Sequence, residues 1–313
     1  MTTIFFTTDI HGSEICWRKF INAGKFYQAD VLVMGGDISG KAIVPIVHQG
    51  NQTYRAVLLE QTHLLHGEDE VQDMMRKIRS RGYYPYRTDM DEMEALRQQP
   101  ERVHTLFKDA VLKTAEEWLA YADERLNGSG IRCFVTPGND DMFELNDVLS
   151  TSKAVTFAEG AVVSLDDDLQ MICSGYSNVT PWHSFREETD EQLLIRYETL
   201  IAKLSNPRKS VFAFHVPPYG SGLDDAPELT ADLRPKYAGN ALVPVGSRSV
   251  RKVIEHYQPL LGLFGHIHEC KATTRIGKTL CVNSGSMYEQ GVLCGALIKI
   301  ERGKIKSHIL TTG

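Results

Sequence analysis

Five short apolar runs, each followed at once by a polar cluster, constrain the fold of this chain more than any other sequence feature. The runs cover residues 4–8, 31–34, 131–136, 211–214 and 260–264. Short runs that are rich in valine, isoleucine and phenylalanine, and that end in glycine or proline, are typical of buried strands. Because helical stretches alternate with these runs, the sequence predicts an α/β protein.

The polar clusters carry the candidate functional residues. They read Asp-Ile-His at 9–11, Gly-Gly-Asp at 35–37, Gly-Asn-Asp-Asp at 138–141, His-Val-Pro-Pro at 215–218 and Gly-His-Ile-His at 265–268. Ligands of α/β sheets collect beyond the carboxyl ends of strands, so five such endings predict one shared site. Carboxylates, an amide oxygen and imidazoles are ligands that divalent first-row metals accept. Each cluster alone is a weak signal, but the ordered series favours a metal site over five coincidental turns.

The spacing within the clusters fits metal coordination. Alternate residues of an extended segment face the same side, so Asp9 and His11 can reach one ion. The same holds for His266 and His268, except that a splayed turn would send one histidine to each of two ions. Asp37 is a candidate bridge, because one carboxylate can hold two ions about 4 Å apart, the separation typical of two-metal phosphoryl chemistry.

In this order the motifs closely resemble those of the calcineurin-like metallophosphoesterase superfamily, and the resemblance extends from Asp9 to His268. The Asn-Ser-Gly-Ser turn at 283–286 is similar to one in bacterial and archaeal members, and the stretch 224–265 resembles the Icc-related branch. The resemblance implies a four-layer α/β/β/α sandwich of two mixed β-sheets flanked by helices. It also implies two divalent metal ions at one edge, for which manganese, iron, zinc and nickel are candidates.

Matched motif by motif, the resemblance implies seven metal ligands: Asp9, His11 and His268 for the first ion, Asn139, His215 and His266 for the second, and Asp37 bridging both. A water shared by two cations loses its proton near neutral pH, and the resulting hydroxide attacks phosphorus in line. The candidate catalytic residues are Asn139, Asp140 and His215. The Asn139 amide can also donate a hydrogen bond to a phosphate oxygen.

Asp140 departs from the family pattern. The family usually reads G-N-H-D or G-N-H-E, and its histidine is taken to protonate the leaving oxygen. A carboxylate beside two cations should have a lowered pKa and be a poor acid at neutral pH. We therefore expect phosphodiesters or activated monoesters to be favoured over ordinary phosphomonoesters. Metal binding, water orientation, substrate contact and a solvated loop position are the other roles open to Asp140.

Residues 41–128 separate the second predicted strand from the third and are expected to be a mainly helical insertion. Residues 42–48 and 54–59 alternate like a hairpin, whereas residues 68–81 and 100–126 have helical spacing. We expect the insertion to form a cap that selects the substrate or a contact between subunits of a homo-oligomer.

Bulk properties set the remaining expectations. A single domain is expected to span residues 1–313, a length that suits one large α/β domain. The net charge of −6 disfavours a broad nucleic-acid or anionic-membrane surface. No signal peptide is recognised, and no stretch approaches the roughly 20 apolar residues of a membrane span. The six scattered cysteines are expected to be free thiols, so a cytoplasmic location is predicted.

The first interpretation is therefore a cytoplasmic, dimetal phosphoesterase that acts on a small phosphoester, with nucleotides among the candidate substrates. The alternative from another class is an interaction scaffold that keeps the sandwich but has lost catalysis. The intact ligand positions oppose this alternative, while Asp140 faintly favours it. A Ser/Thr protein phosphatase is a third interpretation, but those relatives normally retain the histidine that this chain lacks.

Overall fold

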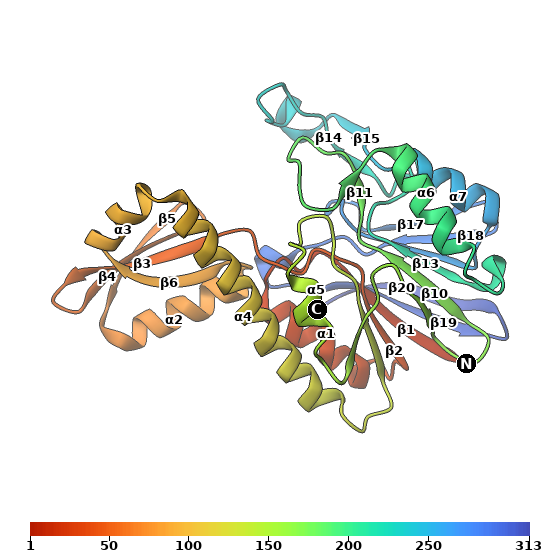
Figure 1. Ribbon diagram of the computed structural model, residues 1–313, viewed down its shortest axis with the longest axis horizontal. Helices are drawn as coiled ribbons and strands as arrows, with labels where there is room; N and C mark the ends of the chain where they lie inside the picture. Colours follow the sequence, from red (N-terminus) through yellow and green to blue (C-terminus); the bar gives the residue numbers. More distant parts are fainter.

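The computed structural model describes residues 1–313, and its centre is a pair of six-stranded mixed sheets (Figure 1). The first sheet contains β1 (Thr2–Thr7), β2 (Val31–Met34), β7 (Arg132–Val135), β8 (Val155–Phe157), β19 (Cys294–Glu301) and β20 (Lys304–Thr312). The second contains β9 (Val162–Ser164), β10 (Gln170–Ser174), β13 (Val211–Phe214), β16 (Leu261–Phe264), β17 (Ala272–Ile276) and β18 (Thr279–Asn283). The strand orders are β20-β19-β1-β2-β7-β8 and β17-β18-β16-β13-β10-β9.

The strands that carry the polar clusters are parallel within each sheet. β1, β2 and β7 pair in parallel, and so do β13 and β16, while antiparallel pairs lie toward the edges. The carboxyl ends of the parallel strands therefore share one edge of each sheet. All five strands predicted from the apolar runs are confirmed.

Side-chain alternation along the strands sets the layers of the sandwich. Ile4 and Phe6 of β1 are buried between the two sheets with Val211 and Leu261 of the second sheet. Phe5, between them in sequence, is buried on the opposite face of β1. This alternation follows from the two-residue repeat of a strand whose two faces are both covered.

Helices cover the outer face of each sheet. The first sheet packs against α1 (Glu14–Phe26), α4 (Pro100–Leu126) and α5 (Leu145–Leu149), and the second against α6 (Asp190–Ile201) and α7 (Arg248–Tyr257). The layers thus run helix, sheet, sheet, helix, so the predicted α/β/β/α sandwich is confirmed.

The insertion forms a lobe beside the sandwich (Figure 1). It contains β3 (Ile43–Gly50), β4 (Thr53–Leu58), β5 (Gln61–His66), α2 (Gly67–Ser80), β6 (Tyr84–Asp89) and α3 (Met90–Arg97). The strands make a separate sheet, β5-β4-β3-β6, which packs against α2 around Ile46, Ala56 and Met74. The expected hairpin and helices are present, and with α4 included helices make up more of residues 41–128 than strands do. β5 and β6 were not expected, so a small sheet accompanies the helices.

The long helix α4 connects this lobe to the sandwich. Its buried residues all lie between Val111 and Leu126, and they belong to the cluster that covers the first sheet. Trp118 stacks on Trp17 of α1 with ring centroids 5.2 Å apart, and its carbonyl accepts a hydrogen bond from the Trp17 indole. The last part of the expected insertion therefore packs on the main body.

The remaining elements are short. They are β11 (Ser177–Asn178) with β12 (Glu187–Glu188), β14 (Asp225–Pro227) with β15 (Leu242–Pro244), and the 3₁₀ turns η1 (Pro207–Lys209), η2 (Lys236–Gly239) and η3 (Tyr288–Gln290). All six cysteines are buried free thiols, as expected. None of the helices combines the length and the apolar character that a membrane crossing requires.

Candidate metal centre

The loops that follow β1 and β2 run side by side at one edge of the first sheet. The amide of Asp9 donates to the carbonyl of Gly36 at 2.9 Å, and the amide of His11 donates to the carbonyl of Asp37 at 2.9 Å. Asp9, His11 and Asp37 have φ angles of 53°, 38° and 50°, in the left-handed region that non-glycine residues seldom occupy. Strained backbone of this kind persists only where the surroundings hold it, and it clusters at functional sites.

Two glycines permit the loops to approach one another. A Cβ atom on Gly36 would collide with the His215 imidazole, and a Cβ on Gly138 would collide with the Asp37 carboxylate. Any other residue at either position would push the loops apart, which explains why each of these two clusters contains a glycine.

Six of the seven predicted ligands lie in two groups, each with ligand atoms within 4.8 Å of one another: Asp9, His11 and His268, and separately Asp37, His215 and His266. His266 has a φ of 66°, and this splayed turn sends the two histidines of the last motif to different groups. Asp37 Oδ2 lies 3.6 Å from His11 Nε2 and 3.4 Å from His215 Nε2. This carboxylate therefore stands between the groups, as a bridging ligand would.

Asn139, the seventh predicted ligand, lies in the loop after β7. Its Oδ1 atom is buried and has no hydrogen-bond partner. Its Nδ2 atom donates to Ser184 Oγ at 2.7 Å and to Asp140 Oδ1 at 3.1 Å. Both amide protons are thus engaged, so the amide oxygen is available as a ligand while the N–H expected to contact phosphate is not free.

The imidazole nitrogens are also arranged for coordination. His215 Nδ1 lies 2.9 Å from the carbonyl of Gly35, which fixes the ring with Nε2 free, and that Nε2 is buried without a partner. His11 Nε2 and His268 Nε2 face each other at 2.9 Å. Buried polar atoms without partners are rare in folded proteins, and a cation would satisfy these.

The pKa values of His11, His266 and Asp37 agree with such a donor set. Burial lowers the pKa of His11 to about 3 and that of His266 to about 4, so both imidazoles are neutral at pH 7. Burial raises the pKa of Asp37, but the neighbouring cationic groups, His215 first, together outweigh burial and leave that pKa well below its usual value. Burial lowers the pKa of His215, yet the charges of Asp37 and Asp9 help to raise it to about 10, so the metal-free imidazole holds a proton that a bound cation would displace. Neutral imidazoles and ionised carboxylates are the forms that bind metals.

Asp140 lies beside both groups, since its ligand atom is within 4.8 Å of those of His11 and Asp37. Burial raises its pKa, Asp37 raises it further, and Lys41 opposes the rise. The sequence led us to expect a lowered pKa for Asp140, and that expectation depends on two cations beside its carboxylate. The protein's own groups raise the pKa of Asp140.

Asp141 supports the centre and was not singled out from the sequence. Its buried carboxylate accepts hydrogen bonds from the amides of Ile38 at 3.0 Å, Ser39 at 2.7 Å and Gly138 at 2.7 Å. It therefore ties the loop that carries Asp37 to the loop that carries Asn139. The only sequence signal was a second acid in the Gly-Asn-Asp-Asp motif.

Arg186 and Asn283 hold the other loops. The buried Arg186 guanidinium donates to the carbonyls of Gly138 and Asp141, and it donates to Asn146 Oδ1 at 2.6 Å. Asn283 Nδ2 donates at 3.1 Å to the carbonyl of Gly265 and at 3.2 Å to that of Ile267. The two hydrogen bonds from Asn283 fix the turn that separates His266 from His268. They give a physical role to Asn283, the first residue of the 283–286 turn.

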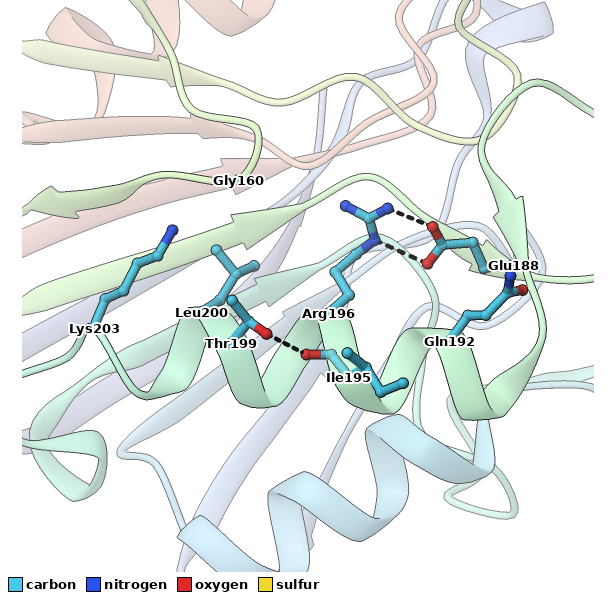
Figure 2. Close-up of a pocket in the computed structure, with 8 residues that line it drawn as sticks. All are labelled: Gly160, Glu188, Gln192, Ile195, Arg196, Thr199, Leu200 and Lys203. Carbon is cyan, nitrogen blue, oxygen red and sulfur yellow. Dashed lines mark hydrogen bonds and ion pairs between the residues drawn. The ribbon is translucent and has the colours of Figure 1, made fainter.

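A cavity of about 430 Å³ lies elsewhere, along α6 (Figure 2). Its lining includes Arg196, which is paired with Glu188, and Thr199, which donates to the carbonyl of Ile195 at 2.7 Å. None of the seven predicted ligands lines it. Because its main polar groups already satisfy one another, it offers no chemistry comparable to that of the ligand cluster.

Comparisons with known proteins place the fold. No family model matches the sequence. An uncharacterized protein of Methanocaldococcus jannaschii, MJ1162, is 31% identical over 149 residues, which cover 47% of this chain and 61% of that protein. The crystal structure of TT1561 from Thermus thermophilus has a TM-score of 0.57 at 13% identity, over 100% of this chain and 98% of that one.

A structure described as a novel archaeal phosphodiesterase aligns over 99% of this chain and 100% of its own, with a TM-score of 0.37 at 12% identity. The likeness to TT1561 bears on fold and not on activity. The layers of the structure are those of the sandwich that the resemblance implied, so the fold class expected from the sequence is confirmed.

Proposed function

We propose that this chain is a phosphoester hydrolase whose seven ligands hold two divalent metal ions, with manganese, iron, zinc and nickel as candidates. The observation that carries this proposal is the position of Asp37 between two histidine–carboxylate groups. The unpartnered Asn139 Oδ1 and His215 Nε2 atoms support it, because both are ligand atoms buried without another use.

The proposed chemistry divides between the ions and the chain. Two bound cations would lower the pKa of a shared water and offset charge on the phosphoryl oxygens. His215 is oriented by the carbonyl of Gly35, and Asn139 by Ser184, so both side chains are held before substrate arrives. Asp141 keeps the two loops at a fixed separation. Such preorganisation lowers the cost of reaching the transition state.

We propose that small phosphodiesters, nucleotides among them, and activated monoesters are the substrates. Asp140 stands where the family has its histidine and pairs with Lys41, so the imidazole that protonates a poor leaving group in the family is missing from this position. A cytoplasmic location and assembly into a homo-oligomer remain parts of this proposal.

A panel of phosphoesters tests the function. Protein supplied with Mn²⁺ is expected to hydrolyse aryl phosphodiesters such as bis(p-nitrophenyl) phosphate faster than alkyl phosphomonoesters. A chelator should abolish hydrolysis, because each metal site depends on its ion, and added Mn²⁺ should restore it. Metal-loaded protein that hydrolyses none of the panel would favour the scaffold interpretation, and hydrolysis that survives complete metal removal would contradict the mechanism.

A further inference from the structure

Lys41, the first residue of the insertion, forms an ion pair with Asp140 at the opening of the ligand cluster. The Lys41 side chain is 40% exposed and that of Asp140 is 27% exposed. By contrast, the side chains of Asp37, His11 and His215 are 0–4% exposed. The pair therefore lies on the solvent side of these three buried ligands, as does His268, whose side chain is 31% exposed.

The insertion holds the backbone of Lys41 from both sides. The amide of Gly40 donates to the hydroxyl of Tyr84 at 2.8 Å, and the amide of Tyr84 donates to the carbonyl of Ala42 at 3.0 Å. A Cβ atom on Gly40 would collide with the carbonyl of Gly82, so the chain approaches the lobe closely here. The buried Tyr84 of β6 thus fixes the residues on either side of Lys41.

Asp140 is fixed as well, so the ion pair has a defined place. Its amide donates to Asp37 Oδ1 at 3.0 Å, and its carboxylate accepts from Asn139 Nδ2 at 3.1 Å. Burial lowers the pKa of Lys41, but the charges of Asp37 and Asp140 raise it above its usual value. The ammonium group is therefore charged at neutral pH, and its field reaches the carboxylate between the two groups.

We propose that Lys41 contacts the phosphoester at this opening and binds the oxygen of the departing group, while Asp140 is the positioning residue that holds the ammonium there. The inference rests on the proposed function. An ammonium has three donors, and the ion pair with Asp140 leaves others for a substrate oxygen. Because negative charge grows on that oxygen as its bond to phosphorus weakens, a fixed cation acts mainly in the transition state.

The bonds and charges balance without proton loss from Lys41. The attacking water gives one proton to solvent, and its oxygen bonds to phosphorus. The bond from phosphorus to the departing oxygen breaks, and its electron pair stays on the departing oxygen. The departing oxygen then takes a proton from solvent. Lys41 offsets the charge until this proton arrives, so poorer leaving groups depend on it more.

The test compares kcat/KM for wild type, Lys41→Met and Lys41→Arg across aryl phosphodiesters of graded leaving-group pKa, at equal Mn²⁺ content. Lys41→Met is expected to change the most activated ester little and to lose about 10²–10³-fold on the poorest, the effect of removing one oxyanion donor. Lys41→Arg should retain most activity. Asp140→Asn should show the same trend with a smaller loss, because it loosens the ammonium without removing it.

Lys306→Met is the matched control, since Lys306 pairs with Glu301 on the surface near the amino-terminal end of β1, away from the cluster. Binding of inorganic phosphate, measured by calorimetry on metal-loaded protein, should weaken in Lys41→Met and not in Lys306→Met. Equal losses across all esters, or no loss in active protein, would overturn the contact with the departing oxygen. An inactive wild type with two ions bound would instead overturn the proposed function.

Discussion

Asp140 and Asp141 are neighbours in the sequence, but their carboxylates have opposite surroundings. Asp140 is partly exposed and pairs with a lysine, whereas Asp141 is buried and accepts from backbone amides of two loops. Asp140 can therefore change partners when a substrate arrives, while Asp141 cannot do so without leaving buried donors unpaired. Substitutions of the two residues should consequently affect different properties.

Asp141→Asn is expected to lower the free energy of unfolding by about 2–4 kcal/mol, because its new NH2 group would face the amide donor of either Ser39 or Gly138. Chemical denaturation measures the loss. Asp89→Asn is the control, since Asp89 caps α3 at the surface and asparagine caps equally well. Equal stability of Asp141→Asn and wild type would show that this carboxylate does not tie the loops together.

The ligand positions could be predicted from the sequence because each motif is local and follows its own strand. Asp141, Arg186 and Lys41 could not be assigned a role in this way. Lys41 meets Asp140 across 99 residues, and Arg186 meets Asp141 across 45. Pairings of this kind depend on how loops meet in three dimensions, and nothing in the flanking residues indicates them.

Among the elements, the strands of the sandwich could be predicted and two strands of the lobe could not. The sandwich strands are buried on both faces, so they read as unbroken apolar runs. β5 has a single buried residue, Leu65, and β6 contains Pro85 at the edge of its sheet. An exposed strand and an edge strand with proline carry weak apolar signals.

The lobe is expected to act on the cluster through β6. Tyr84→Phe removes the hydroxyl that accepts from the Gly40 amide, so it should cost about 1–3 kcal/mol of unfolding free energy and loosen Lys41. Its kcat/KM should fall most on poor leaving groups, as in Lys41→Met. Tyr86→Phe, in the same strand, removes only a bond to Glu92 and should leave kcat/KM unchanged. Identical kcat/KM values for Tyr84→Phe and Tyr86→Phe would show that the lobe does not act on the ligand cluster through β6.

At the scale of the whole molecule, the sandwich brings together residues from both sheets. Asp9, Asp37 and Asn139 follow strands of the first sheet, whereas His215, His266 and His268 follow strands of the second. The apolar layer between the sheets fixes their separation, and close-packed interiors resist deformation. The two-metal hypothesis therefore requires that the two sheets pack on one another as they do in this structure. That packing is the sandwich implied by the resemblance of the motifs.

Metal content per chain tests the central claim most directly. Elemental analysis of purified protein supplied with Mn²⁺ is expected to give about two ions per chain for wild type and for Asp168→Asn, an exposed control at the far end of β10. Asp37→Asn weakens both sites at once, so it should retain at most about one ion and lose at least about 100-fold in phosphodiester hydrolysis. No bound metal in the folded wild type, or an Asp37→Asn variant with two ions and normal hydrolysis, would contradict the account.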